Sequence, residues 1–245
     1  MARSTSRKKA HTTQYNVDQY LNEIKAHYSA HADAKTAAPM KKYMREQFEF
    51  LGIKTPETTK LHKQFVTAHG WPSIEQLIPI AESLWQWPER EYQYLALRYV
   101  DHFEGQLTSS FLDTIEGLVL QKSWWDTVDE IAIHAVGDLF ARYPVEREPY
   151  LDKWRSHDSI WLRRTTLLFQ LSYKEKTDAD LLFTLIEENL GSREFFINKA
   201  IGWALREYSK TEPNAVTTFV NQTQLSALSR REALKWMNRT EKKKE

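Results

Sequence analysis

A repeat of about 35 residues constrains the fold of this 245-residue chain more than any other feature. Trp125, Trp161 and Phe196 each stand near the start of a long segment in which apolar residues recur every three or four positions. Between these segments run shorter ones of the same periodicity, which begin near Glu146 and Asp178. Helix pairs that recur at such an interval are typical of an α-solenoid of the HEAT type. The sequence therefore predicts an all-α superhelix of HEAT-like repeats with a curved groove.

The helical spacing of apolar residues extends along most of the chain, and no segment alternates as a β-strand would. We expect helices over residues 16–30, 37–50, 56–69, 74–86, 88–103, 108–121, 124–142, 146–156, 159–173, 178–190, 193–209, 213–221 and 226–238. Asp129, Arg164 and Lys199 follow one another at intervals of 35 residues. Equivalent positions of stacked repeats adjoin one another, so these three side chains are expected to line one wall of the groove. A compact, irregular helical bundle is the alternative architecture.

The composition excludes several classes of protein. Apolar residues make up 41% of the chain, and no run approaches the roughly 18 apolar residues that a membrane span needs. The absence of cysteine excludes disulfides and cysteine metal sites, and it fits a cytoplasmic location. The net charge is only +1, but residues 1–13 and 239–245 are rich in lysine and arginine. We expect these two ends to be basic tails around a single repeat domain over residues 14–238.

The segment from Lys122 to Asp129 reads Lys-Ser-Trp-Trp-Asp-Thr-Val-Asp and combines two tryptophans with two carboxylates. Trp125 and Asp129 are four residues apart, so on a helix they share one face. A large π surface beside a carboxylate suits the binding of a cationic or sugar-like ligand. The alternative is structural: one tryptophan fills the core, while Asp126 and Asp129 cap or solvate the helix end.

A second segment, residues 194–208, carries Lys199, Trp203 and Arg206 among apolar residues suited to packing. A lysine four residues before a tryptophan makes a cationic, aromatic patch on one helix face. Such a patch suits a phosphodiester backbone or the face of a base.

Other kinds of site lack their motifs. The sequence has no HExxH and no histidine pair at ligand spacing that carboxylates support, so we expect no metal. It has no GxSxG, GxGxxG or P-loop either, and we expect no cofactor. His134 lies on an apolar helix face, which predicts a hydrogen-bonded core residue.

Five stretches of the sequence, taken together, resemble the DNA alkylation repair family, the AlkD-like HEAT-repeat DNA glycosylases. They are residues 42–56, 84–93, 122–129, 161–164 and 194–210. The resemblance extends from about Tyr43 to Lys235. It implies a superhelix whose concave face binds duplex DNA, in agreement with the repeat.

Position by position, the family's aromatic–carboxylate pair falls on Trp125 and Asp129, and its groove arginine falls on Arg164. The resemblance places two further functional positions, Trp203 and Tyr43, and the cationic and aromatic residues of the repeat complete the expected DNA contacts. The residues expected to contact DNA are Trp203, Tyr43, Lys199, Trp161 and Arg206.

The resemblance implies hydrolysis of the N-glycosidic bond of N3- or N7-alkylated purines in duplex DNA, the first step of base excision repair. We expect the protein to be a monomer. Such a purine is cationic, so it leaves as a neutral base without a general acid. Asp129 would stabilise the oxocarbenium-like sugar and place a water molecule. Trp125 and Trp203 would contact the sugar and the lesion, and Arg164 would hold a nearby phosphate. The family is thought to leave the base stacked.

Two non-enzymatic functions compete with this interpretation. The first is a HEAT-type scaffold or DNA-structure-binding module, in which the groove residues bind phosphate and Asp129 is incidental. The second is a protein-binding solenoid, which the arginine, lysine and tryptophan residues of the expected groove disfavour. The intact set of Trp125, Asp129 and Arg164 favours the glycosylase.

Overall fold

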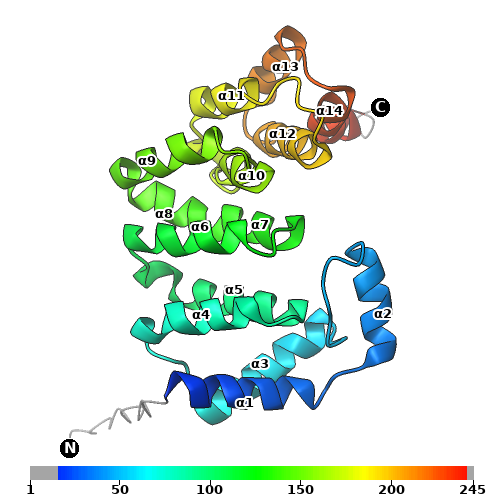
Figure 1. The fold of residues 1–245 in the computed structure, drawn as a ribbon. Coiled ribbons are helices and arrows are strands. Elements are labelled where there is room, and N and C mark those ends of the chain that lie inside the picture. Colours follow the sequence, from blue (N-terminus) through cyan, green and yellow to red (C-terminus); the bar gives the residue numbers. More distant parts are fainter. Residues whose placement is uncertain (1–15, 242–245) are drawn as a thin grey trace, which may run out of the picture. The chain divides into compact units, whose positions relative to one another are not determined.

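The computed structural model describes residues 16–241, which form α-helices joined by short loops (Figure 1). Within this range there is no β-strand, only an isolated β-bridge between Glu49 and Glu89. The predicted all-α, helical-repeat class is therefore confirmed. Contacts divide the chain into two compact units, residues 1–99 and 100–245. The expected N-terminal tail and residues 242–245 of the C-terminal tail lie outside the described residues.

The first unit ends within its fifth helix, and its second helix is shorter than expected. Its elements are α1 (Val17–Ser29), α2 (Ala34–Tyr43), α3 (Thr55–His69), the 3-10 turn η1 (Ile74–Gln76), α4 (Leu77–Gln86) and α5 (Arg90–Phe103). The prediction that α2 continues to residue 50 is wrong. Arg45 and Glu46 have φ values of 55° and 60°, and this left-handed backbone ends the helix.

The loop after α2 is held by one buried carboxylate. Glu91, at the start of α5, accepts the backbone N–H groups of Leu51 (3.0 Å), Gly52 (2.9 Å) and Ile53 (3.1 Å). Gly52 has a φ of 88°, and a Cβ there would lie 2.1 Å from the backbone oxygen of Asp33. Glycine is therefore needed at this position, and Glu91 fixes a loop that has no helical hydrogen bonds of its own.

Replacing Glu91 should destabilise the first unit. Glu91→Gln keeps one acceptor oxygen but replaces the other with an amide NH2. This donor then faces a backbone N–H that donates to the carboxylate in the wild type. We expect a loss of about 2 kcal/mol in the free energy of unfolding, measured by chemical denaturation. Glu57→Gln, an exposed position in the first turn of α3, is the matched control. Equal stability of the two variants would contradict the loop-anchoring role.

The second unit takes in the end of α5 and continues with two 3-10 turns and a succession of helices. Its elements are η2 (Glu104–Gln106), η3 (Ser109–Phe111), α6 (Leu112–Leu120), α7 (Trp125–Ile131), the π-helical turn η4 (Ala132–Val136), α8 (Gly137–Arg142), α9 (Pro144–Arg155), α10 (Ile160–Leu168), η5 (Lys174–Lys176), α11 (Ala179–Glu187), α12 (Phe195–Tyr208), α13 (Pro213–Gln222) and α14 (Ala227–Glu241). The helix α14 extends past residue 238, where we expected the helix to end.

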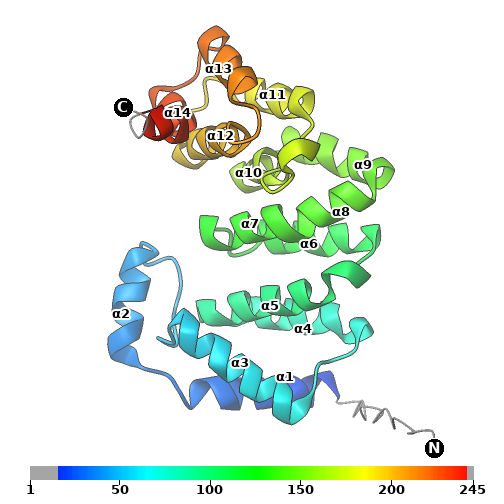
Figure 2. The ribbon, with the colours of Figure 1, turned by 180° about the vertical axis from the view of Figure 1, so that it is seen from behind.

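The predicted repeat appears directly in this unit. The helices α7, α10 and α12 begin at Trp125, Ile160 and Phe195, at intervals of 35 residues. They pack on one another in chain order, and α14 packs on α12 (Figures 1 and 2). The repeat therefore places equivalent turns of three helices against one another, and the candidate site is built on those turns.

No helix of residues 16–241 combines the length and the apolar character that crossing a membrane requires.

Candidate active site

The centre of the candidate site is an ion pair between neighbouring repeats. Arg164 of α10 donates from Nε to Oδ1 of Asp129 at 2.7 Å and from Nη2 to Oδ2 at 2.8 Å. This is the two-pronged geometry in which a guanidinium binds a carboxylate most strongly. The third nitrogen of Arg164, Nη1, donates to the backbone oxygen of Phe196 in α12. One side chain thus connects α7, α10 and α12.

Both members of the pair are buried: Asp129 is 8% exposed and Arg164 is 4% exposed. Burial raises the pKa of the Asp129 carboxyl above its ordinary value, and the hydrogen bonds and charge of Arg164 offset part of this rise. Asp126 and Glu130 raise the pKa further. Asp129 is therefore a carboxylate in a low-dielectric site, where its charge acts more strongly than in water.

The structure uses Arg164 differently from our expectation. We expected its guanidinium to hold a DNA phosphate, but Arg164 is buried and directs all three of its nitrogens to protein oxygens. The first step of the expected ladder is present, because Asp129 and Arg164 are in contact. Lys199 does not extend this series of contacts, because its Nζ pairs with Glu232 of α14. On α12 it is the backbone oxygen of Phe196 that contacts Arg164.

Breaking the pair from one side should cost more than removing it entirely. We expect Arg164→Met to lower the free energy of unfolding by about 3–5 kcal/mol, because it leaves the buried carboxylate without its partner. The double variant Asp129→Leu/Arg164→Met should regain most of that loss, since it removes both charges. Urea denaturation of the single and double variants measures the difference. Additive losses would show that the two side chains are not energetically coupled.

A cluster of three aromatic rings adjoins the ion pair. Trp124 immediately precedes α7, and Trp161 and Phe196 lie in the first turns of α10 and α12. Their ring centroids are 5.7 Å apart for the two tryptophans and 5.0 Å from each tryptophan to Phe196. We expected Trp125 to be the repeat equivalent of Trp161, but the ring in contact with Trp161 is that of Trp124. All three rings are only partly buried, so the cluster forms part of the surface beside Asp129.

Two further aromatic side chains flank this cluster. Trp125 is the first residue of α7, one turn before Asp129, and it is partly exposed. Phe195 is 53% exposed and makes an edge contact with Phe196 at 5.4 Å between ring centroids. The sequence identified Trp125 and missed Phe195 and Trp124. The available signal for Phe195 was its place at the start of a helix beside a second phenylalanine, but we assigned it to packing with the apolar residues that follow.

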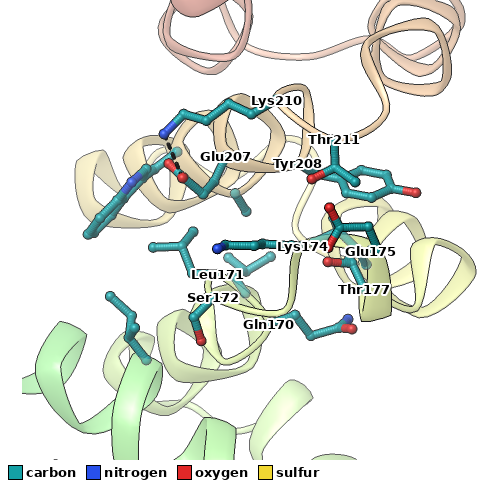
Figure 3. A pocket seen from close by; sticks show the side chains of 15 residues that line it. Gln170, Leu171, Ser172, Lys174, Glu175, Thr177, Glu207, Tyr208, Lys210 and Thr211 are labelled. Atoms are coloured by element: carbon teal, nitrogen blue, oxygen red, sulfur yellow. Dashed lines mark hydrogen bonds and ion pairs between the residues drawn. The ribbon is translucent and has the colours of Figure 1, made fainter.

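Trp203 lies two turns further along α12 and borders a cavity of about 520 Å³. Ile133 and Leu167 also line it, and they follow Asp129 and Arg164 by four and three residues on their helices. Figure 3 shows the side chain of Lys174 extending between Leu171 and Glu207, with the ion pair of Glu207 and Lys210 beside it. The cavity beside Trp203 is thus lined by residues that follow Asp129 and Arg164 along the chain by about one helical turn.

The two cations that flank Trp203 on α12 share one acidic partner. Lys199 Nζ lies 3.2 Å from Oε2 of Glu232, and Arg206 Nη1 lies 2.9 Å from the same oxygen. The sequence identified both cations as DNA-binding candidates, and it did not identify Glu232. Lys199 and Arg206 remain partly exposed, as a phosphate contact requires.

The remaining candidate, Tyr43, belongs to the first unit, where it ends α2 and is 70% exposed. The prediction that His134 is a core residue is wrong: its side chain is about half exposed and lies 3.7 Å from Glu130. His134 follows Glu130, which is also about half exposed, by four residues, so the two side chains share the solvent-facing side of the segment. Across residues 16–241, no group of three or more histidines and acidic residues is placed to hold a metal ion.

The comparisons with known proteins agree with this architecture. Residues 24–237 match the family described as DNA alkylation repair enzyme. A solved structure described as a predicted DNA alkylation repair enzyme from Enterococcus faecalis is 38% identical in sequence, with a TM-score of 0.77. The alignment covers 84% of this chain and 96% of that one. No curated protein matches the sequence significantly.

The fold is therefore that of a helical-repeat protein in which a buried aspartate–arginine pair connects the stacked helices α7, α10 and α12. The chain belongs to the DNA alkylation repair enzyme family. Membership of this family gives it a role in the repair of alkylated DNA.

Proposed function

We propose that this chain is a DNA glycosylase, which hydrolyses the N-glycosidic bond of cationic N3- or N7-alkylated purines in duplex DNA. The observation that carries the proposal is the Asp129 carboxylate, which Arg164 orients and which a cluster of aromatic side chains borders. The family match supplies the substrate class, alkylated DNA.

The chemistry asks little of the protein because the lesion is already activated. When the bond between C1′ and the base nitrogen breaks, its electron pair neutralises the cationic purine, which leaves without a proton donor. Positive charge then develops on the sugar, and a nearby buried carboxylate stabilises it. Water adds its oxygen to C1′ and releases one proton. Each oxygen of Asp129 has two lone pairs, so its hydrogen bonds with Arg164 leave acceptors for this water.

Arg164 acts on Asp129 in this proposal, not on DNA. Its hydrogen bonds and positive charge favour the ionised carboxylate against the cost of burial. They also fix the orientation of Asp129 relative to Trp125, one turn earlier on α7. Removing Arg164 should therefore impair the reaction through the geometry and ionisation of its partner.

The aromatic and cationic residues supply binding. Trp125, Trp161 and Trp203 offer π faces to the sugar and to the cationic base. The cations of α12, Lys199 and Arg206, are suited to phosphates of the duplex, and Tyr43 adds a contact from the first unit. This division leaves a single carboxylate for the chemistry and several partly exposed side chains for affinity.

Release of free base from duplex DNA that contains N7-methylguanine tests the proposal. Wild-type protein should release the methylated base, and Asp129→Asn should release none above the spontaneous rate. The Asn variant is isosteric, so its affinity for duplex DNA with an abasic-site analogue should be nearly unchanged. Thermal unfolding of the variant checks that the buried site survives. Full activity of Asp129→Asn would move the reaction to another group, with Asp126 the first to examine.

The pH dependence of excision should report the environment of Asp129. The ionised carboxylate is the active form, so the single-turnover rate should rise with pH as Asp129 loses its proton. Because the pKa of Asp129 is raised, the acidic limb should lie at higher pH than that of an exposed aspartate. The spontaneous depurination rate is subtracted at each pH. A rate that stays constant as the pH falls to the ordinary pKa range of an aspartate would contradict this assignment.

The second candidate function is binding of DNA without cleavage. It is favoured by one observation, the bidentate hydrogen bonding of Arg164 to Asp129, which partly neutralises the carboxylate. Duplex binding by wild-type protein without release of the methylated base would favour it over the glycosylase.

A further inference from the structure

A second charged cluster lies where α14 packs on α12, and it joins the two α12 cations assigned above to DNA phosphates with residues of α14 that have no role in the proposed reaction. Glu232 of α14 is buried and faces three cations: Lys199 at 3.2 Å, Arg206 at 2.9 Å and Lys235 at 3.8 Å, all measured to Oε2. Burial raises the pKa of Glu232, but Lys199, Lys235 and Arg206 outweigh it and hold the pKa below its ordinary value of 4.5. The carboxylate is therefore ionised at neutral pH.

A glycine lets this carboxylate reach the face of α12. A Cβ at Gly202 would lie 2.5 Å from Cβ of Glu232 and 2.9 Å from the backbone oxygen of Ser229. The hydroxyl of Ser229 in turn donates to the backbone oxygen of Asn198 at 3.0 Å. The two helices therefore pack backbone to backbone at this point. This close approach places Glu232 between cations that stand on either side of Gly202.

The cluster carries more positive charge than its carboxylate can balance. Trp203 follows Lys199 by four residues, and Arg206 follows Trp203 by three, so the three side chains share one face of α12. Three cations surround one acid, which leaves an excess of two positive charges. The side chains of Lys199 and Lys235 are about 36% and 45% exposed, whereas that of Glu232 is 9% exposed. An anion can thus approach the cations from solvent on the side opposite the carboxylate.

We propose that Lys199, Arg206 and Lys235 form a binding site for a phosphate of the duplex backbone, with Glu232 as its internal counterion. In the unbound protein the carboxylate holds the cations close together, which lowers the entropy lost when they meet a phosphate. Its charge also competes with the phosphate, so each contact is weaker than three unopposed cations would give. The site rests on the proposed function, because duplex DNA is the partner in both.

The competition makes an unusual prediction: removing Glu232 should strengthen DNA binding. We expect Glu232→Gln to tighten binding of an undamaged duplex about tenfold at moderate salt, as for one added charge-assisted contact. The slope of log affinity against log salt should become steeper by about one unit, because a further phosphate contact releases counterions. Fluorescence anisotropy with a labelled duplex, across a series of salt concentrations, measures both. A purely structural role for Glu232 would not steepen the salt slope.

Glu188→Gln is the matched control. It removes one negative charge from the same unit and turns the ion pair of Glu188 with Arg155, whose Nε lies 2.8 Å away, into a neutral contact. This control should change neither affinity nor salt slope appreciably. In the Glu232→Gln background, Lys199→Gln should abolish most of the gain. If Glu232→Gln does not fold, Glu232→Asp withdraws the carboxylate while keeping its charge, and it should give a smaller gain in affinity.

Unchanged or weaker duplex binding by the folded Glu232 variants, relative to the control, would overturn the inference. So would a wild-type protein and variants that all lack measurable duplex affinity. The base-release assay separates this result from the proposed reaction. Base release with an unaltered salt slope in Glu232→Gln refutes the phosphate site alone. Tighter binding without base release by the wild type refutes the glycosylase alone.

Discussion

The second unit depends on the buried pair of Asp129 and Arg164. Burying a guanidinium among three helices is costly unless its N–H groups have hydrogen-bond acceptors. The carboxylate of Asp129 in α7 and the backbone oxygen of Phe196 in α12 are those acceptors. This requirement fixes the axial register of α7, α10 and α12. The same register brings Trp124, Trp161 and Phe196 together at the helix starts, so the aromatic surface follows from the placement of one ion pair.

The sequence was sufficient to predict the class of fold, most helices of the second unit and the placement of Asp129 and Arg164 at equivalent positions of neighbouring helices, but not their hydrogen bonds to each other. The reason is that a fixed interval acts through stacking: helices that begin 35 residues apart bring equivalent turns together. Lys199 shows where this reasoning ends. Lys199 lies 35 residues after Arg164, but its side chain pairs with Glu232 of α14. The packing of α14 on α12, which brings Glu232 to Lys199, does not follow the 35-residue interval.

Two other differences from prediction have local backbone causes. Trp124 and Trp125 are adjacent, and periodicity alone does not say which one precedes the first helical turn. Trp124 has an extended backbone (φ −158°, ψ 160°) and therefore points to the aromatic cluster, while Trp125 starts α7. The early end of α2 depends on left-handed φ values at Arg45 and Glu46, residues that carry no glycine-like signal. Apolar spacing does not report such backbone choices.

The π-helical turn after Asp129 has a consequence for the phase of the whole segment. A ring closed between residues five apart accommodates one residue more than an α-helical ring, so the side chains that follow rotate by about 100° about the helix axis. Asp129, before the turn, accepts hydrogen bonds from Arg164 of α10, and Phe140, after it, packs on Trp154 of α9 and on Phe169 at the end of α10. The turn thus sets how the side chains of α8 are rotated relative to Asp129. Deleting a residue between Ala132 and Val136 would restore uniform winding and leave either the carboxylate or the apolar residues facing the wrong neighbour.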